Sequence, residues 1–215
     1  MHSTKDFWTW FETLNLGLRK VSFKKIFQYL DTRPDPIVIV ETGCARQHGN
    51  WQGDGQSTVL FDRYCAHRAW GSGVFSVDID PTAVDLCRSL VSDRVTVSVS
   101  DSLSWLYNLR SQIVSPVSLL YLDSYDVDWN HVWPSAAHHL KELTAAGPLV
   151  GADTLVVVDD APAQALLASD SDSQYQLLDQ PRIGGKGQLV AQYAQSLGSQ
   201  LFFSHYQAAW LGINH

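Results

Sequence analysis

Apolar and polar positions follow two alternating patterns along this 215-residue chain. Runs rich in Val, Ile and Leu cover residues 37–42, 73–79, 94–100, 117–122 and 154–158, and most of these runs are apolar at nearly every position. Such runs are typical of parallel strands that are buried on both faces. Between them, residues 57–69, 81–91, 102–109 and 133–145 have helical apolar spacing and begin at a capping residue or a proline. The alternation predicts an α/β fold: a Rossmann-like, doubly wound sheet with helices on both faces.

The two ends of the chain follow other patterns. Residues 5–30 space their aromatic and aliphatic side chains as helices do, and two prolines follow, which predicts a helical preface over residues 1–34. Packing is its preferred role, while a lid or a dimer surface, and hence a homo-oligomer, stays open. Residues 189–194 and 201–211 look extended and are separated by a short segment, which predicts a terminal antiparallel hairpin. We therefore expect one domain, residues 1–215, with a seven-stranded core over residues 37–211.

Composition narrows the classes of function. The formal charge is −7, and Lys and Arg are scattered singly, so the chain offers no basic stripe for nucleic acid. Neither a long apolar span nor a signal sequence is evident, which predicts a cytoplasmic protein without a membrane partner. Cys44, Cys65 and Cys87 lack metal-ligand spacing and are interpreted as buried thiols. A small molecule is the expected partner.

Polar residues at the ends of the first two predicted strands indicate a cofactor site. The first strand ends in Glu41-Thr42-Gly43-Cys44, where glycine lets the backbone approach a ligand and the following helix offers unpaired N–H groups. The second strand ends at Asp78, whose carboxylate can accept hydrogen bonds from both hydroxyls of a ribose. Asp80 precedes Pro81 and is interpreted as a helix cap. Because ligands of such sheets lie beyond the carboxyl ends of the strands, a nucleotide-like cofactor is predicted here.

At these residues the chain resembles the class I S-adenosylmethionine-dependent methyltransferases, over roughly residues 37–211. The family has five parallel strands and a terminal hairpin. The resemblance implies that S-adenosylmethionine is the cofactor and that it is bound by Glu41, Gly43, Ser57, Asp78, Asp101 and Ser102. Within that set Asp78 would hold the ribose, Ser57 the methionine carboxylate, and Asp101 the adenine. The segment 44–56 is longer than the usual loop. The extra residues either form only additional surface loop or belong to the site. In the second case, Arg46 would pair with the cofactor carboxylate or Trp51 would line the acceptor pocket.

Two further strand ends are acidic. Asp123 follows the fourth predicted strand, and Asp159 and Asp160 follow the fifth. Three carboxylates that converge on one volume repel each other unless a cation intervenes, and such oxygen ligands suit Mg²⁺, Mn²⁺ or Ca²⁺. Here the resemblance narrows to the divalent-metal-dependent O-methyltransferases of catechols and antibiotic sugars, which implies a metal, Mg²⁺ first, on these three residues. The alternative is that strand-end aspartates cap helices and tighten turns.

The predicted reaction is metal-assisted O-methyl transfer to a small hydroxylated acceptor, sugar-like or polyhydroxylated. A dication would lower the pKa of the acceptor hydroxyls, and a general base would take one proton. The catechol enzymes carry a lysine three residues beyond the first metal ligand, a position that is Asp126 here. Asp126 is therefore the first candidate for the general base. Asp128 and His131 are the next candidates, and Lys186 is the last.

Other interpretations stay open. A nicotinamide-dependent oxidoreductase would share the glycine turn and Asp78 but would need a catalytic Tyr and Lys on one helix, which the sequence does not show. A cofactor-binding scaffold without catalysis is the third interpretation. The polar stretch 162–187 either folds over the acceptor site or has no function.

Overall fold

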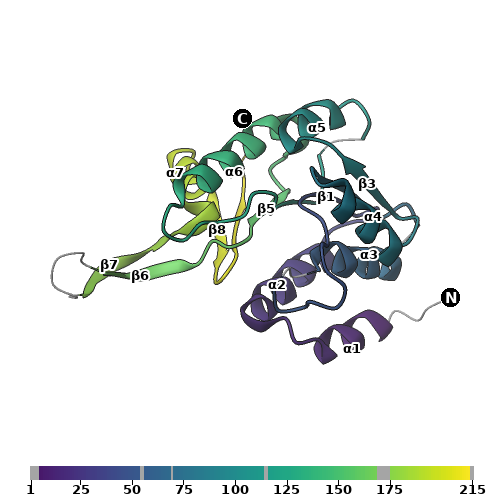
Figure 1. Ribbon diagram of the computed structural model, residues 1–215, viewed down its shortest axis with the longest axis horizontal. Helices are drawn as coiled ribbons and strands as arrows, with labels where there is room; N and C mark the ends of the chain where they lie inside the picture. The colour runs from purple at the N-terminus through teal and green to yellow at the C-terminus, as the bar shows by residue number, and fades with distance from the viewer. Residues whose placement is uncertain (1–4, 54–55, 69, 114–115, 169–174, 214–215) are drawn as a thin grey trace.

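A seven-stranded mixed sheet organises the chain. The computed structural model describes residues 5–53, 56–68, 70–113, 116–168 and 175–213 (Figure 1). Strands β1 (Val38–Thr42), β2 (Gly73–Asp78), β3 (Val95–Val99), β4 (Leu119–Leu122) and β5 (Leu155–Val158) run parallel in the order β3-β2-β1-β4-β5. All five lie within two residues of their predicted bounds, and the predicted α/β sheet is confirmed. Consecutive apolar residues mark β4 and β5 because these strands are buried at every position.

Helices cover both faces of this sheet (Figure 1). The N-terminal α1 (Lys5–Thr13), η1 (Gly17–Arg19) and α2 (Lys20–Asp31) lie with α3 (Ser57–His67) on one face. On the other face lie α5 (Ser102–Leu109), α6 (Trp133–Ala145), η2 (Gly147–Leu149) and α7 (Gln188–Ser196). Helix α4 (Pro81–Leu90) packs against β2 and β3, and its Asp80 cap is confirmed, since that carboxylate accepts from the Thr82 amide at 2.9 Å.

The predicted helical preface is part of the hydrophobic core. Phe11, Phe23 and Phe27 are fully buried, and Phe23 stacks on Tyr121 of β4 with 5.9 Å between ring centroids. The packing interpretation of the preface is therefore confirmed. Trp51 joins the same cluster, 5.8 Å from the Trp10 ring, so its contact is with α1.

The C-terminal third differs from the prediction. Residues 189–194 were expected to form a strand but lie in α7, because Val190 and Ala194 are one helical turn apart and are buried together. The terminal hairpin consists of β8 (Gln200–Ser204) and β9 (Ala208–Leu211) instead. Strand β9 is inserted antiparallel between β5 and β8, which completes the order β3-β2-β1-β4-β5-β9-β8.

A second, two-stranded antiparallel sheet was not predicted at all. Strands β6 (Ala163–Ala168) and β7 (Tyr175–Ile183) pair with each other and project from the main body (Figure 1). The single turn η3 (Gly185–Gly187) follows and returns the chain to the carboxyl edge of the main sheet, where it contacts α6. Within the described residues, every helix is too short or too polar to cross a membrane.

Candidate active site

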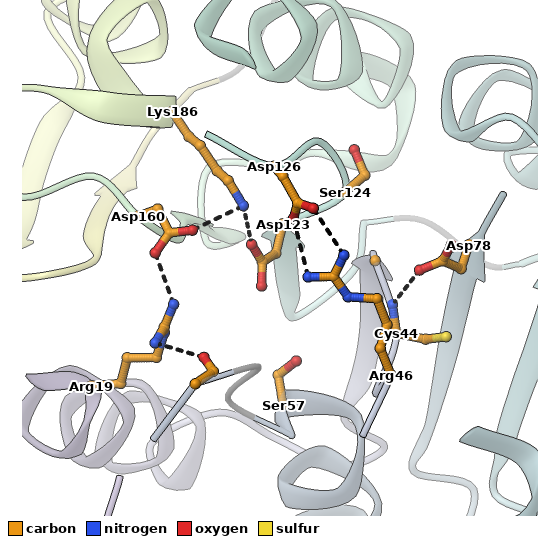
Figure 2. Close-up of a pocket in the computed structure, with 12 residues that line it drawn as sticks. Arg19, Cys44, Arg46, Ser57, Asp78, Asp123, Ser124, Asp126, Asp160 and Lys186 are labelled. Carbon is orange, nitrogen blue, oxygen red and sulfur yellow. Dashed lines mark hydrogen bonds and ion pairs between the residues drawn. The ribbon is translucent and has the colours of Figure 1, made fainter. Parts of the chain in front are cut away.

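One pocket opens at the carboxyl ends of β1, β2, β4 and β5 (Figure 2). Nearly all of its lining is polar: Arg19, Gly43, Cys44, Arg46, Gly53, Ser57, Asp78, Asp123, Ser124, Asp126, Asp160 and Lys186. Seven of the residues that the sequence predicted to bind the cofactor, bind the metal or act as the base line this pocket together: Gly43, Arg46, Ser57, Asp78, Asp123, Asp126 and Asp160. They come together because the parallel strands end at one edge of the sheet.

The glycine turn after β1 brings two strand ends into contact. Gly43 has φ +81°, a left-handed conformation that favours glycine. A Cβ atom at Gly43 would lie only 2.5 Å from the Asp123 carbonyl oxygen. On the other side of the turn, the Asp78 carboxylate accepts from the amides of Cys44 at 3.2 Å and Asp80 at 2.9 Å. The predicted juxtaposition of the glycine turn and the strand-end acid is therefore present.

Glu41 lies below this turn, facing the start of α3. Its carboxylate is fully buried and accepts hydrogen bonds from Ser57 at 2.5 Å, Thr58 at 2.7 Å and Ser76 at 2.7 Å. Burial raises the pKa of Glu41 to about 7, even though the three hydroxyl donors act in the opposite direction. Glu41 is outside the pocket lining, and Ser57, which lines it, directs its hydroxyl to Glu41.

The two residues expected to meet adenine lie at the start of α5. Asp101 is the helix cap and accepts from the Ser104 amide at 2.8 Å, which lowers the pKa of Asp101. The Ser102 hydroxyl lies 3.1 Å from Nε2 of His138. Neither residue lines the pocket, so their contact with adenine stays a prediction.

Arg46 and Asp126 form a bidentate ion pair across the pocket mouth, with distances of 3.0 and 3.1 Å (Figure 2). This hydrogen bonding to Arg46 lowers the pKa of Asp126. The other two candidate bases lie outside the pocket lining: Asp128 and His131 are exposed, and the Asp128 carbonyl accepts from the His131 amide at 2.9 Å. Of the three, only Asp126 is placed next to the pocket.

Lys186 lies between two of the predicted metal ligands (Figure 2). Its Nζ atom is 2.5 Å from Asp123 and 3.1 Å from Asp160, and the side chain is buried. The turn η3 that carries it is held closely against β5, since the Lys186 amide donates to the Asp160 carbonyl at 3.0 Å. Gly185 allows this approach, because a Cβ atom there would overlap the same carbonyl oxygen.

Asp159 takes a different direction. Nε of Arg19 lies 2.8 and 3.0 Å from its two oxygens, and the Tyr121 hydroxyl donates to it at 2.7 Å. Nη2 of Arg19 reaches Asp160 at 2.8 Å. The chain turns sharply after β5, since Asp160 has φ +43°, in the left-handed region. Asp159 is buried towards Tyr121, and of the two only Asp160 lines the pocket.

The residues present do not fit the predicted divalent ion in this arrangement. Asp159 and Asp160 are paired with Arg19, and Asp123 and Asp160 with Lys186, so every one of the three acids already has an internal cation. In the part of the chain that the structure describes, no group of three or more His, Cys, Asp or Glu side chains is arranged to hold a metal. The glycine-rich segment around Lys186 was a signal for that residue, whereas nothing in the sequence marks Arg19 as a partner of residues 140 positions away.

A buried glutamate behind the pocket was also missed. Glu142 of α6 is fully buried and accepts from Ser124 at 2.6 Å and Thr42 at 3.1 Å, and His138 lies 3.4 Å away. It thereby ties the ends of β1 and β4 to a helix. A single glutamate within a helical pattern gives no sign of this role.

Comparison with known proteins identifies the fold. Neither a protein-family model nor a curated protein sequence matches this chain. Among solved structures, SMU.1697c, a putative methyltransferase from Streptococcus mutans in complex with SAH, matches with a TM-score of 0.54 and 9% identity over 93% of this chain and 100% of that one. The O-methyltransferase from Bacillus cereus in complex with SAH gives 0.50 and 15% over 97% and 90%.

Two further matches are a sugar N-methyltransferase and a methyltransferase from the mycinamycin biosynthetic pathway. The sugar N-methyltransferase KedS8 from Streptoalloteichus gives a TM-score of 0.52 and 8% identity over 99% of this chain and 94% of that one. MycE, a methyltransferase from the mycinamycin biosynthetic pathway in complex with Mg and SAH, gives 0.49 and 15%, and this chain spans only 39% of its length. At these identities the comparisons show the fold alone, and this chain has the fold of the class I methyltransferases, including the reversed strand β9.

Proposed function

We propose that this protein transfers a methyl group from S-adenosylmethionine to an oxygen of a small hydroxylated acceptor. The observation that carries the proposal is the Asp78 carboxylate beside the Gly43 turn, at the edge of a sheet with the methyltransferase strand order. That the Bacillus cereus and Streptococcus mutans proteins bind SAH on the same fold supports the choice of cofactor.

The residues of the pocket suit this cofactor. Asp78 can accept from both ribose hydroxyls, and Gly43 leaves the backbone free of a side chain where the cofactor would pass. Arg46 is the cation at the pocket mouth, and its pair with Asp126 is exposed enough to exchange for the carboxylate of a methionine. When bound, S-adenosylmethionine supplies a methyl group activated by its sulfonium charge.

Asp126 is the group that we assign to receive the acceptor's proton. It lines the pocket, whereas Asp128 and His131 do not. Exchange of Arg46 from Asp126 to the cofactor carboxylate would raise the pKa of Asp126 and so make it a stronger base when the pocket is filled. The polar lining suits an acceptor rich in hydroxyl groups, such as a sugar or another polyol. No step of this proposal passes through a metal ion, because Arg19 and Lys186 already neutralise the acids predicted to hold it.

Calorimetric titration with S-adenosylmethionine tests the cofactor. We expect Asp78→Asn to weaken binding by about tenfold or more, because hydrogen bonds to a charged acceptor are lost. Asp80→Asn is the matched control: it is two residues away, keeps a capping oxygen for α4, and should bind as the wild type does. Absence of binding by the folded wild type, or equal effects of the two variants, would contradict the proposal.

Release of SAH with a panel of sugars, polyols and catechols then tests the transfer. Turnover with at least one hydroxylated compound, reduced by Asp126→Asn, is the expected result. Tight cofactor binding without turnover across the panel would favour a binding scaffold instead.

A further inference from the structure

The strand-end acids of this pocket are occupied by cations that belong to the chain itself. Lys186 bridges Asp123 and Asp160, and Arg19 bridges Asp159 and Asp160. Together these two side chains carry two positive charges, which is the charge of one divalent ion. The three carboxylates are therefore neutralised to the same extent as they would be by Mg²⁺.

We infer that Lys186 and Arg19 replace the divalent metal in this pocket, so that the wild-type protein binds no catalytic metal ion and holds its acids with internal cations. The inference deepens the proposed function, on which it rests for the identity of the pocket. It differs from the expectation drawn from the sequence, in which the same three acids bind Mg²⁺.

Geometry supports the replacement. A divalent ion bound by Asp123 and Asp160 would have to occupy the volume between their oxygens, and Nζ of Lys186 is already there, within 2.5 and 3.1 Å of them (Figure 2). Mg²⁺ needs oxygen ligands at about 2.0–2.1 Å in near-octahedral geometry, so the ammonium and the ion cannot share that volume. Asp159 cannot contribute a ligand to the pocket without releasing Arg19 and Tyr121.

Several contacts besides the ion pairs fix Lys186 and Arg19 in position. The Lys186 amide donates to the Asp160 carbonyl, Gly185 is needed for that contact, and the Lys186 side chain is 2% exposed. Arg19 is likewise held by more than its ion pairs, since its Nη1 atom donates to the Gly53 carbonyl at 3.1 Å and its guanidinium stacks over Tyr206 at 4.7 Å. Two separate segments, η1 and η3, thus each deliver one cation to the acids.

Mn²⁺ titration followed by electron paramagnetic resonance tests the inference without cofactor or acceptor. The wild type should bind no Mn²⁺ saturably in the millimolar range. Lys186→Met leaves Asp123 and Asp160 facing each other without an ammonium, and we expect it to gain one Mn²⁺ site, about tenfold or more tighter than any binding by the wild type. Adding Asp160→Asn to Lys186→Met should remove the new site.

Control variants show whether a gain of Mn²⁺ binding depends on removing the positive charge at residue 186. Lys186→Arg keeps the positive charge, and Lys141→Met removes a lysine from the exposed face of α6. Neither variant should gain a saturable Mn²⁺ site. Saturable binding of one Mn²⁺ by the wild type, lost in Asp160→Asn, would overturn the inference, as would a folded Lys186→Met variant that gains no site. If Lys186→Met fails to fold, the comparison of wild type with Asp160→Asn still decides. Failure of S-adenosylmethionine binding would refute the proposed function and leave these Mn²⁺ results unaffected.

Discussion

Replacement of Glu41 by glutamine should change how the stability of the protein depends on pH. Glu41 is fully buried below the glycine turn, and burial raises its pKa from 4.5 to about 7. Between these two values the folded state holds a proton on Glu41 that the unfolded state releases. The free energy of unfolding therefore falls as pH rises through this window, and it is constant with respect to this group above and below it.

The size of the effect follows from the same two values. One unit of pKa corresponds to 1.36 kcal/mol, so a pKa that rises from 4.5 to about 7 lowers the stability by about 3 kcal/mol across the window. Glutamine is nearly isosteric and carries no titrating proton. It keeps one of the two acceptor oxygens, on the side of either Ser57 or Thr58, and its NH2 group faces the other hydroxyl. The stability difference, wild type minus Glu41→Gln, should fall by that amount between pH 4.5 and 7.5.

Urea unfolding, followed by tryptophan fluorescence at a series of pH values, measures this difference. Other groups cancel because both proteins contain them: for example, burial lowers the pKa of His139 to about 4, which makes both proteins lose stability as pH falls below 6.5. Glu12→Gln is a surface control and should leave the slope unchanged in this window. Parallel stability curves for wild type and Glu41→Gln would refute the reasoning.

Two further substitutions test the framework of the pocket. Gly43→Ala places a methyl group 2.5 Å from the Asp123 carbonyl in a left-handed conformation, so it should cost about 2 kcal/mol or more in urea unfolding and weaken S-adenosylmethionine binding in calorimetry. An unchanged stability would show that the β1 and β4 ends are not in contact. Tyr121→Phe removes the hydroxyl that donates to Asp159 and accepts from Gln207, and should cost about 1–3 kcal/mol, whereas the exposed Tyr107→Phe should cost little. Equal melting temperatures for the two tyrosine variants would contradict this.

The sequence was most informative where structure is local. Consecutive apolar residues located β4 and β5, which are buried at every position. At the edge of the sheet, β3 alternates Val with Thr and Ser and is partly exposed, but its β-branched residues still mark a strand. The same rule failed at residues 189–194, where a short apolar run belongs to a helix that buries only Val190 and Ala194. Short apolar runs fit either period, and only the tertiary contacts of α7 with α6 decide between them.

The composition of the pocket was predictable in part for a related reason. Parallel strands end at a common edge, so Gly43, Asp78, Asp123 and Asp160 had to meet there once the strand order was known. The direction of each side chain was not fixed by this argument. Asp159 and Asp160 are adjacent in sequence, yet one is buried on Tyr121 and the other lines the pocket.

The positive charges that neutralise Asp123, Asp159 and Asp160 come from residues far away in the sequence. A cluster of carboxylates at a strand edge requires positive charge, but the sequence of the strands does not state whether that charge is a bound metal or a side chain. In this protein the positive charge belongs to Arg19 of η1, which the N-terminal helices pack against the sheet, and to Lys186 of η3, which follows the β6–β7 sheet. Arg19 and Lys186 lie outside the five parallel strands that define the fold. Proteins that share those strands can therefore differ in whether their strand-end acids face a metal ion or an internal cation, and these two segments are where that difference has to be sought.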